Sequence, residues 1–473
     1  MVVFRSTRLV NYHRRRLNQL IDCRKLCSLR SEPSQPLPGR KPKYVSAKEA
    51  LSVLQSGDLV SMQAVAGAPK ALAKGMLEVG IANNLTDVKV FHLMSLTIPD
   101  YMKPEYSKIF RVRASFTSGL DREAINSGRA DYIPMFLSET GLLFRRNILK
   151  PKVTMLQVTP VDEHGFHSMG PSVTSIRDSI KVSEYVIGEV NPRLPRTVGD
   201  STIHESQFDY LVENETELDA LNPKPMSDVE KQIGKHIADN LIEDGATLQM
   251  GIGGIPDAVL AQCKNHKDLG IHTEMFSDGV IDLIENGNIT NRLKNTEKGF
   301  LTATFIIGST RFYDYFHNNP YLIMKTCDYT NDQHVIGSNP KVTAINSCIE
   351  IDITGQAASD TVGTKIYSGF GGQVDFLRGA ALSFDGKGKP ILALPSTTNK
   401  GESKIVPYLK HGAGVTSTRA HVHYVVTEYG IASLFGLSNR QRAHQLISIA
   451  HPDHRESLEK AAFERLKCMP SKD

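Results

Sequence analysis

The sequence has few cysteines and no long apolar stretch. Its 473 residues include six cysteines, spread from Cys23 to Cys468. So sparse a set argues against a disulfide scaffold and fits a reducing compartment. Cys23 and Cys27 have no second pair or histidine cluster nearby to complete a zinc site, so no bound metal is expected. No run approaches the roughly 18–20 uninterrupted apolar residues that a membrane helix needs, so no membrane partner is expected either.

Acidic side chains are scarce at the N-terminus. Residues 1–45 carry a net charge of +9 against +4 for the whole chain, which leaves −5 for the rest. A mildly acidic body argues against a nucleic-acid partner. The basic, Ser-containing leader with interleaved apolar residues is typical of a mitochondrial transit peptide, and it predicts import into the mitochondrial matrix. A disordered basic arm is the alternative. The Pro-rich stretch 33–42 separates this leader from the body.

The body alternates short strands with helices, which predicts an α/β fold of two open, mainly parallel sheets. A capping box at Ser46 opens the first helix, and a strand is expected over residues 59–62. The polar stretch 213–225 is typical of a linker. A second capping box at Ser227 then restarts the pattern. We therefore expect a transit peptide and linker over 1–45, an N-terminal domain over 46–215 and a C-terminal domain over 226–465.

A glycine-rich turn follows the strand expected at 246–250. It comprises Gly251, Ile252, Gly253, Gly254 and Ile255, and a helix follows it. Such a turn lets the backbone approach an anion at the helix N-terminus, so it is a candidate phosphate site. Pro256 replaces the third glycine of a dinucleotide fingerprint, and no Gly-Lys-Ser/Thr sequence makes it a P-loop. A simple tight turn remains the alternative.

Glu274 lies near the end of a strand expected over 271–275. In open α/β sheets, ligands bind at the carboxyl ends of the strands. A carboxylate there can be a nucleophile, a metal ligand or a structural partner of a backbone N–H, and the local sequence leaves these open.

Two further clusters are candidate binding elements. Gly369, Gly371 and Gly372 free a run of backbone amides for an anion or oxyanion, although a flexible turn before a helix is the alternative. The polar loop 394–407 carries Lys400 and Lys404, for which simple solvation is the alternative.

Taken together, these motifs resemble the acetyl-CoA hydrolase/transferase family, the class I CoA transferases. The resemblance covers about residues 46–465, and the length and basic leader are most like those of its mitochondrial acetate:succinate members. The motifs that carry it are 251–256, 272–279, 371–379 and 424–430 in the second half, and 158–165 and 191–200 in the first.

The resemblance implies a two-domain CoA transferase fold and a specific chemistry. The enzyme would move CoA between an acyl-CoA and a short-chain carboxylic acid, with acetate and succinate expected first, by ping-pong kinetics. Glu274 would be the nucleophile and form a glutamyl-CoA thioester, and Gly371 and Gly372 would bind the oxyanion. The 251–255 loop would hold CoA, together with Asn346 and Lys400. Coenzyme A would be a substrate with no permanently bound cofactor, and the chain would form a homodimer or a higher homo-oligomer. Acetyl-CoA hydrolysis on the same scaffold is the alternative.

Overall fold

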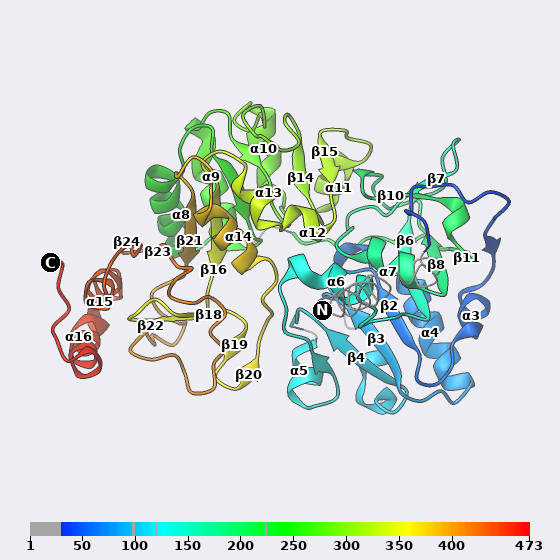
Figure 1. Ribbon diagram of the computed structural model, residues 1–473, viewed down its shortest axis with the longest axis horizontal. Helices are drawn as coiled ribbons and strands as arrows, with labels where there is room; N and C mark the ends of the chain where they lie inside the picture. Colours follow the sequence, from blue (N-terminus) through cyan, green and yellow to red (C-terminus); the bar gives the residue numbers. More distant parts are fainter. Residues whose placement is uncertain (1–29, 97–99, 120, 223–224) are drawn as a thin grey trace, which may run out of the picture.

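The computed structural model describes residues 30–473 apart from 97–99, 120 and 223–224. Each half of this chain builds one large sheet. Residues 30–213, the N-terminal half, lie at one end of the molecule, and residues 226–473, the C-terminal half, lie at the other (Figure 1). The expected α/β class with two open, mainly parallel sheets is confirmed.

The N-terminal half contains a parallel sheet that is buried on both faces. Its eight strands run in the spatial order β1 (Lys43–Tyr44), β11 (Tyr210–Glu213), β8 (Tyr185–Val190), β6 (Val153–Val158), β2 (Leu59–Met62), β3 (Val88–His92), β4 (Phe110–Ala114) and β5 (Asp131–Tyr132). Alternate residues of β6 show why the strands are apolar throughout. Val153 and Met155 pack with helix α4 (Lys70–Ala82), and Leu156 and Val158 pack with α7 (Ile176–Val182).

Smaller helices complete the N-terminal half. They are α3 (Ala47–Ala50), α5 (Asp121–Asn126) and α6 (Thr140–Arg145), with the 3-10 turn η5 (Leu137–Glu139) before α6. The antiparallel pair β7 (Phe166–Ser168) and β10 (Thr202–His204) lies outside the large sheet.

The C-terminal half contains a six-stranded sheet. The spatial order is β13 (Gly270–Ile271), β12 (Thr247–Met250), β16 (Thr343–Ser347), β21 (Lys389–Ala393), β23 (Tyr424–Thr427) and β24 (Gly430–Ser433). All pairs are parallel except the last, in which β24 runs antiparallel to β23. On β21, Ile391 packs in the core that contains α8 (Asp228–Leu241) and α9 (Gly254–Gln262), and Leu392 packs in the core that contains α14 (Gln373–Ala381) and α15 (Asn439–Ser448).

Further helices and short strands of the C-terminal half lie outside this sheet. They are the helices α10 (Gly279–Glu285), α11 (Thr310–Phe316), α12 (Cys327–Thr330), α13 (Gln333–Gly337) and α16 (Pro452–Leu466), and the strands β17 (Glu350–Asp352), β18 (Ala357–Ala358), β19 (Thr361–Val362), β20 (Lys365–Ile366) and β22 (Ile405–Val406). Among the described residues, no helix is both long and apolar enough to cross a membrane.

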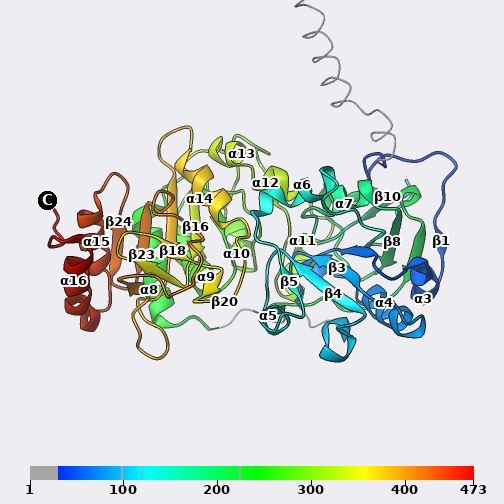
Figure 2. The same ribbon diagram turned by 60° about the horizontal axis from the view of Figure 1, so that its bottom comes forward.

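The two halves interlock at their junction. Strand β9 (Val198–Gly199) of the N-terminal half pairs in parallel with β15 (Leu322–Met324), which in turn pairs with β14 (Leu301–Ala303). Helices α6 and α12 lie side by side there in both views (Figures 1 and 2). The N-terminal half therefore lies close to the elements that follow β13.

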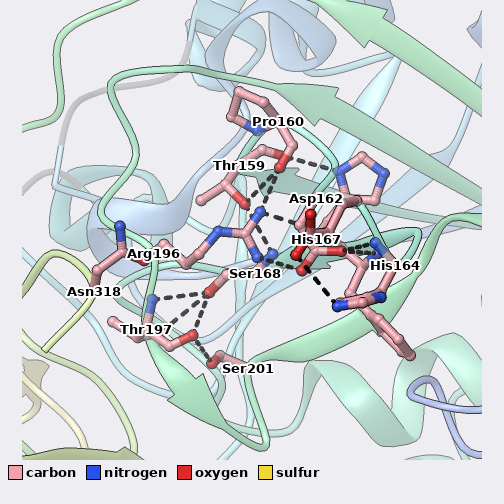
Figure 3. A network of polar contacts seen from close by, with 12 residues as sticks. Thr159, Pro160, Asp162, His164, His167, Ser168, Arg196, Thr197, Ser201 and Asn318 are labelled. Atoms are coloured by element: carbon pink, nitrogen blue, oxygen red, sulfur yellow. Dashed lines mark hydrogen bonds and ion pairs between the residues drawn. The ribbon is translucent and has the colours of Figure 1, made fainter. Parts of the chain in front are cut away.

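The motifs at 158–165 and 191–200 form a polar network at this junction (Figure 3). The Arg196 guanidinium donates to the Pro160 carbonyl at 2.6 Å and lies 3.3 Å from Asp162, and the backbone N–H of Asn318 donates to the Arg196 carbonyl at 2.8 Å. Ser168 Oγ donates to the Thr197 carbonyl at 2.9 Å. The contact between Arg196 and Asn318 links the two halves, and the other contacts hold the two motifs of the N-terminal half together as a scaffold.

Most of the local elements expected from the sequence are present in the structure. The strand over 59–62 and the capping box at Ser227 are confirmed. Ser46 also caps its helix, but that helix is only one turn long and continues as a 3-10 turn. The strand expected over 271–275 was too long, because β13 ends at Ile271. Beyond it the backbone is held by isolated bridges, and this leaves the chain free to turn Glu274 toward the junction.

Residues 30–45 pack against the N-terminal sheet. The Arg30 guanidinium donates to Asp209 at 2.7 Å and to the Gln207 carbonyl at 2.8 Å, and β1 is the edge strand of the sheet beside β11. Residues 30–45, which were expected to belong to the leader and linker, therefore contact the N-terminal half. Residues 1–29, which hold most of the expected transit peptide and both Cys23 and Cys27, lie outside the described part of the chain.

Candidate active site

A cavity of about 730 Å³ lies at the carboxyl ends of β12 and β16, where the two halves meet. Its wall includes Met250 and Asn346 from these strand ends, the 367–373 segment that leads into α14, and Phe116 from the N-terminal half. Glu274 lies in this wall, where it is partly exposed. Among the described residues that line the cavity, Glu274 is the only carboxylate, and Lys404 and Lys410 are the only cations.

The backbone around Glu274 is held on both sides. Its carbonyl accepts hydrogen bonds from the N–H groups of Thr304 at 3.0 Å and Phe305 at 3.2 Å. The neighbouring Thr273 hydroxyl donates to the Met250 carbonyl at 3.0 Å, which ties the segment to the end of β12. These contacts leave the Glu274 side chain as the part of the segment that faces the cavity.

Helix α14 presents its N-terminus to Glu274. Its N-cap is Gly372, whose backbone N–H donates to the Glu274 carboxylate. The helix spans nine residues, and its first turn adds the positive end of the helix dipole beside the carboxylate. A β-carbon on Gly372 would lie 2.2 Å from Glu274 Oε2, so only glycine allows this approach. Gly371 has φ +52°, in the left-handed region that favours glycine.

Asn331 and Asp375 complete the surroundings of the carboxylate. Asn331 Nδ2 lies 3.3 Å from Glu274 Oε2 and 3.5 Å from Asp375 Oδ2, so one amide group contacts both acids. Both Asn331 and Asp375 are fully buried. Burial raises the pKa of Asp375 to about 7, although hydrogen bonds from Ser138 and Asn331 oppose this.

The pKa of Glu274 is raised to about 7, chiefly because burial disfavours the charged carboxylate. The negative charge of Asp375 raises it further, and the hydrogen bonds from Asn331 and Gly372 act in the opposite direction. His272, two residues away, is buried and its Nε2–H donates to the Thr330 carbonyl at 2.9 Å. Burial lowers the pKa of His272 to about 3, so this ring is neutral and packed.

We expect kcat/KM to rise with pH around a midpoint near 7. The nucleophile role that the resemblance implies for Glu274 requires the ionised carboxylate. Since its pKa is about 7, we expect activity above that pH and its loss as the pH falls through it. The measurement is kcat/KM for an acyl-CoA between about pH 5.5 and 8.5. A profile that stays flat down to about pH 5 would mean that no group with this pKa controls the free enzyme.

The residues of the 251–255 loop are divided between three environments. Gly251 and Ile252 line the cavity of Glu274. Gly253 and Gly254 line a neighbouring cavity of about 350 Å³, and Ile255 is buried in the core. A β-carbon on Gly254 would lie 2.0 Å from Glu230 Oε1, so a carboxylate already occupies that side of the α9 N-terminus. The structure therefore leaves Gly251 and Ile252 as the part of the loop that a ligand in the Glu274 cavity can reach.

Asn346, Lys404 and Lys410 line the cavity, whereas Lys400 does not. Asn346 lines the cavity and exchanges hydrogen bonds with Gln249 at 2.9 and 3.3 Å. Lys400 is exposed and is absent from the described cavity wall, whereas Lys404 and Lys410 line it. Lys404 is half-buried, and burial lowers its pKa. Lys400 and Lys404 belong to the same polar loop, and of these two lysines the structure places Lys404 in the cavity wall.

Sequence reasoning missed the contacts from distant parts of the chain. Phe116, Asn331 and Lys410 stand in no glycine-rich or acidic motif. Only tertiary packing brings Phe116 and Lys410 to the cavity wall and Asn331 to Glu274. In chemical terms, the site offers one carboxylate, backbone N–H donors beside it and two cations at a cavity large enough for a cofactor-sized ligand.

Two family profiles and several proteins of known activity match most of this chain. Profiles of the acetyl-CoA hydrolase/transferase N-terminal and C-terminal domains match residues 40–222 and 308–462. The succinyl-CoA:acetate/propanoyl-CoA:succinate CoA transferase of Fasciola hepatica is 53% identical over 93% of this chain and 92% of its own length. The 4-hydroxybutyrate coenzyme A transferase of Clostridium kluyveri is 44% identical over 88% of this chain and 96% of its own.

A solved structure and more distant relatives extend the comparison. The crystal structure of RipA from Yersinia pestis has a TM-score of 0.84 and 33% identity, and the alignment covers 90% of this chain and 98% of RipA. The acetyl-CoA hydrolase of Kluyveromyces lactis is similar at only 29% identity.

Proposed function

This chain belongs to the acetyl-CoA hydrolase/transferase family and is a CoA transferase, and we propose that Glu274 is the nucleophile through which it transfers CoA. One observation carries the proposal. Glu274 is the only carboxylate in the described wall of the junction cavity, and it lies against the N-terminus of α14. A carboxylate with a raised pKa beside backbone N–H donors suits attack on a thioester.

The proposed reaction begins with two substitutions. A Glu274 carboxylate oxygen attacks the thioester carbonyl carbon of the acyl-CoA, the carbon–sulfur bond breaks, and the CoA thiolate leaves an acyl-glutamyl anhydride. The thiolate then attacks the glutamyl carbonyl carbon, the bond to the bridging oxygen breaks, and the first acid leaves as its carboxylate. Glu274 is now a glutamyl-CoA thioester. An acceptor carboxylate repeats the two substitutions in reverse, so no proton is gained or lost overall.

Each step passes through a tetrahedral oxyanion. The Gly372 N–H and the Asn331 amide, which contact the Glu274 carboxylate, are the proposed donor pair for the oxyanion that forms at the glutamyl carbon. Such a donor contributes roughly 2.7–4 kcal/mol to the transition state when it is held in place. Of the two glycines expected from the sequence, Gly371 and Gly372, the proposed pair keeps Gly372, and the Asn331 amide supplies the second donor. No general base is required, in keeping with the neutral, buried His272.

The proposed substrates are a CoA ester of a short-chain acid and a free acid, with succinate and acetate first. The Fasciola hepatica relative is named for succinyl-CoA, acetate and propanoyl-CoA, and its 53% identity over most of the chain supports the choice. The hydrolase alternative is weaker, because the acetyl-CoA hydrolase relative is only 29% identical. In a transferase, water must be kept from the glutamyl-CoA thioester.

The proposal is tested by trapping the thioester. The protein is incubated with succinyl-CoA without an acceptor acid and then treated with borohydride, and the modified residue is located by peptide mass spectrometry. We expect the label on Glu274 and none in Glu274→Ala. Retained transfer activity in Glu274→Ala, with no label in the wild type, would refute the role of Glu274.

A second assay separates transfer from hydrolysis. Release of free CoA and formation of acetyl-CoA are followed with and without added acetate, at several fixed succinyl-CoA concentrations. A transferase forms acetyl-CoA only with acetate and gives parallel double-reciprocal lines. Rapid CoA release that is indifferent to the acid would favour the hydrolase.

Lys404 is the proposed cation for the phosphates of CoA. We expect Lys404→Ala to raise the KM for the acyl-CoA about 5- to 30-fold, because a charge-assisted contact contributes ~1–2 kcal/mol. Lys400→Ala is the matched control from the same loop, and its KM should change by at most about twofold, as for other surface substitutions. Initial-rate kinetics on both variants measure this. Equal effects would mean that CoA extends over Lys400.

We also propose that the protein is imported into the mitochondrial matrix and forms a homodimer or a higher homo-oligomer. The basic leader supports import, and because Arg30 packs on the N-terminal sheet, the proposed processing site precedes that residue. N-terminal sequencing of the mature protein tests this, and an unprocessed chain would contradict it. Light scattering tests the oligomer.

A further inference from the structure

The peptide between Gly371 and Gly372 is held from both sides. Its carbonyl, on Gly371, accepts a hydrogen bond from the Leu137 backbone N–H at 2.9 Å. Its N–H, on Gly372, donates to Glu274. In a trans peptide these two groups point in opposite directions and rotate as one rigid plane. A contact that holds the carbonyl therefore also sets the direction of the N–H.

Ser138, which follows Leu137 in η5, makes a second contact with the C-terminal half. Ser138 donates to Asp375 with its hydroxyl at 2.8 Å and with its backbone N–H at 3.2 Å. Asp375 in turn lies 3.5 Å from the Asn331 amide nitrogen, which lies 3.3 Å from Glu274. Two chains of contacts thus lead from η5 of the N-terminal half to one carboxylate of the C-terminal half.

The segment 369–372 has little room to move, because residues of the N-terminal half pack against it. A β-carbon on Gly369 would lie 2.9 Å from Phe116 Cα, and one on Gly371 would lie 3.1 Å from the Phe116 ring. Phe116 and η5 therefore enclose the turn from different elements of the N-terminal half. A donor held in this way needs no reorganisation during the reaction, which is the condition for strong oxyanion stabilisation.

We propose that η5 is a positioning element for catalysis, in which Leu137 and Ser138, acting through Gly371 and Asp375, align the Gly372 and Asn331 donors on Glu274. This inference rests on the proposed role of Glu274 as the nucleophile. It makes Ser138 and Asp375 positioning residues, since neither contacts Glu274 directly. It also means that the donor set is complete only where the two halves are docked.

The first test uses Ser138→Ala, Ser138→Thr and Asp375→Asn. Asp328→Asn is the matched control. Its carboxylate lies 2.9 Å from Arg145 of the N-terminal half, so the substitution also removes a charged contact between the halves, but one that does not involve Gly371 or Asp375. The readouts are the single-turnover rate of glutamyl-CoA formation, kcat, the KM for the acyl-CoA and the thermal midpoint.

We expect kcat and the single-turnover rate to fall about 10- to 100-fold in Asp375→Asn and about fivefold or more in Ser138→Ala, because a displaced donor forfeits part of the roughly 10²–10³-fold effect of a whole one. Ser138→Thr, which keeps the hydroxyl, should recover most of the loss. The KM should stay within about threefold, since CoA binds elsewhere in the cavity. Asp328→Asn should keep the wild-type rate.

Asp375→Asn also has a signature that a packing role would not produce. Its charge raises the pKa of Glu274, so removing it should move the acidic limb of kcat/KM to lower pH. The other titratable groups that face the two acids are Cys327 of α12 and Glu139 of η5. Cys327 stays a neutral thiol because its pKa is raised well above the ordinary value. The Glu139 side chain is present in both the variant and the wild type.

A backbone test uses Leu137→Pro against Leu137→Ala. Both remove the buried side chain, but only proline removes the N–H that holds the Gly371 carbonyl. Phe136 has φ −75° and ψ 148°, and Leu137 is the first residue of its turn, so the chain accepts proline at this position. We expect the proline variant to be at least about tenfold slower than the alanine variant in single turnover.

The outcomes separate the inference from the proposed function. If Glu274 is labelled by trapping, but Ser138→Ala, Asp375→Asn and Leu137→Pro (relative to Leu137→Ala) keep wild-type rates and the wild-type pH profile, the positioning role is refuted and the nucleophile stands. If Asp375→Asn does not fold, Ser138→Ala with its threonine rescue decides alone. If Glu274→Ala remains active, the nucleophile and the positioning role both fall.

Discussion

Replacing Glu274 by glutamine should lower kcat for CoA transfer by at least about 10,000-fold while the protein still folds and binds acyl-CoA. Loss of a covalent nucleophile typically costs this much or more. The amide keeps the shape of the side chain and its acceptor oxygen for Asn331 and Gly372, but it cannot form an anhydride. Steady-state transfer assays measure the effect, and a thermal-shift titration with CoA checks that binding remains.

The stability of this variant provides an internal control. The folded pKa of Glu274, about 7, lies above its ordinary value of 4.5, so the folded protein binds more protons than the unfolded chain between these values. Stability contributed by the neutral carboxyl is therefore lost as the pH rises through this window. At pH 8 we expect Glu274→Gln to unfold at a temperature equal to or above that of the wild type, and the difference should vanish below about pH 4.5. An inactive but destabilised protein would instead indicate misfolding.

Replacing Gly372 by alanine should lower kcat about 10²- to 10³-fold, which is the effect of removing one oxyanion donor. The backbone at this residue, φ −96° and ψ 6°, is open to any residue, so the change adds no backbone strain. Its β-carbon would, however, lie 2.2 Å from both Glu274 Oε2 and Asn331 Nδ2. The carboxylate and the amide must therefore move away from the donor. Single-turnover formation of the glutamyl-CoA thioester measures the loss.

Gly119→Ala is the control for this substitution. Gly119 is exposed, and a β-carbon there would meet no heavy atom within 4 Å. Both variants add one methyl group to the chain, so only a local steric effect can distinguish them. A Gly372→Ala enzyme with the rate of Gly119→Ala would show that the contact between α14 and Glu274 is not required.

The expected fold was largely correct because its signals are local. The apolar strands, the capping box at Ser227 and the glycine turn between β12 and α9 each depend on residues that are close in sequence. The predicted length of β13 was wrong, because the length of an edge strand depends on its pairing with the neighbouring strand. Beyond Ile271 that pairing stops, and the Thr273 hydroxyl instead donates to the Met250 carbonyl.

In the candidate site, too, local motifs identified some residues, whereas tertiary packing decided the position of others. The roles expected for Glu274, Gly371 and Gly372 came from motifs, and the cavity brings these residues together. Lys400 lies outside its wall and Lys404 lies in it, although both stand in one polar loop. Spacing alone cannot decide which side chain of a loop faces a cavity, because the loop's path depends on its packing.

The sequence by itself determined the α/β class, the two-sheet organisation and the identity of Glu274 as the candidate nucleophile, since periodicity, caps and motifs are written in contiguous residues. Only the tertiary structure decided what surrounds that carboxylate. Asn331, the C-cap of α12, contacts it directly and is itself contacted by Asp375 of α14, whereas Leu137 and Ser138 approach from the other half of the chain. These contacts join residues up to 237 positions apart, and such pairs become neighbours only when the two sheets dock. Burial among them raises the pKa of Glu274, and no local sequence pattern encodes that environment.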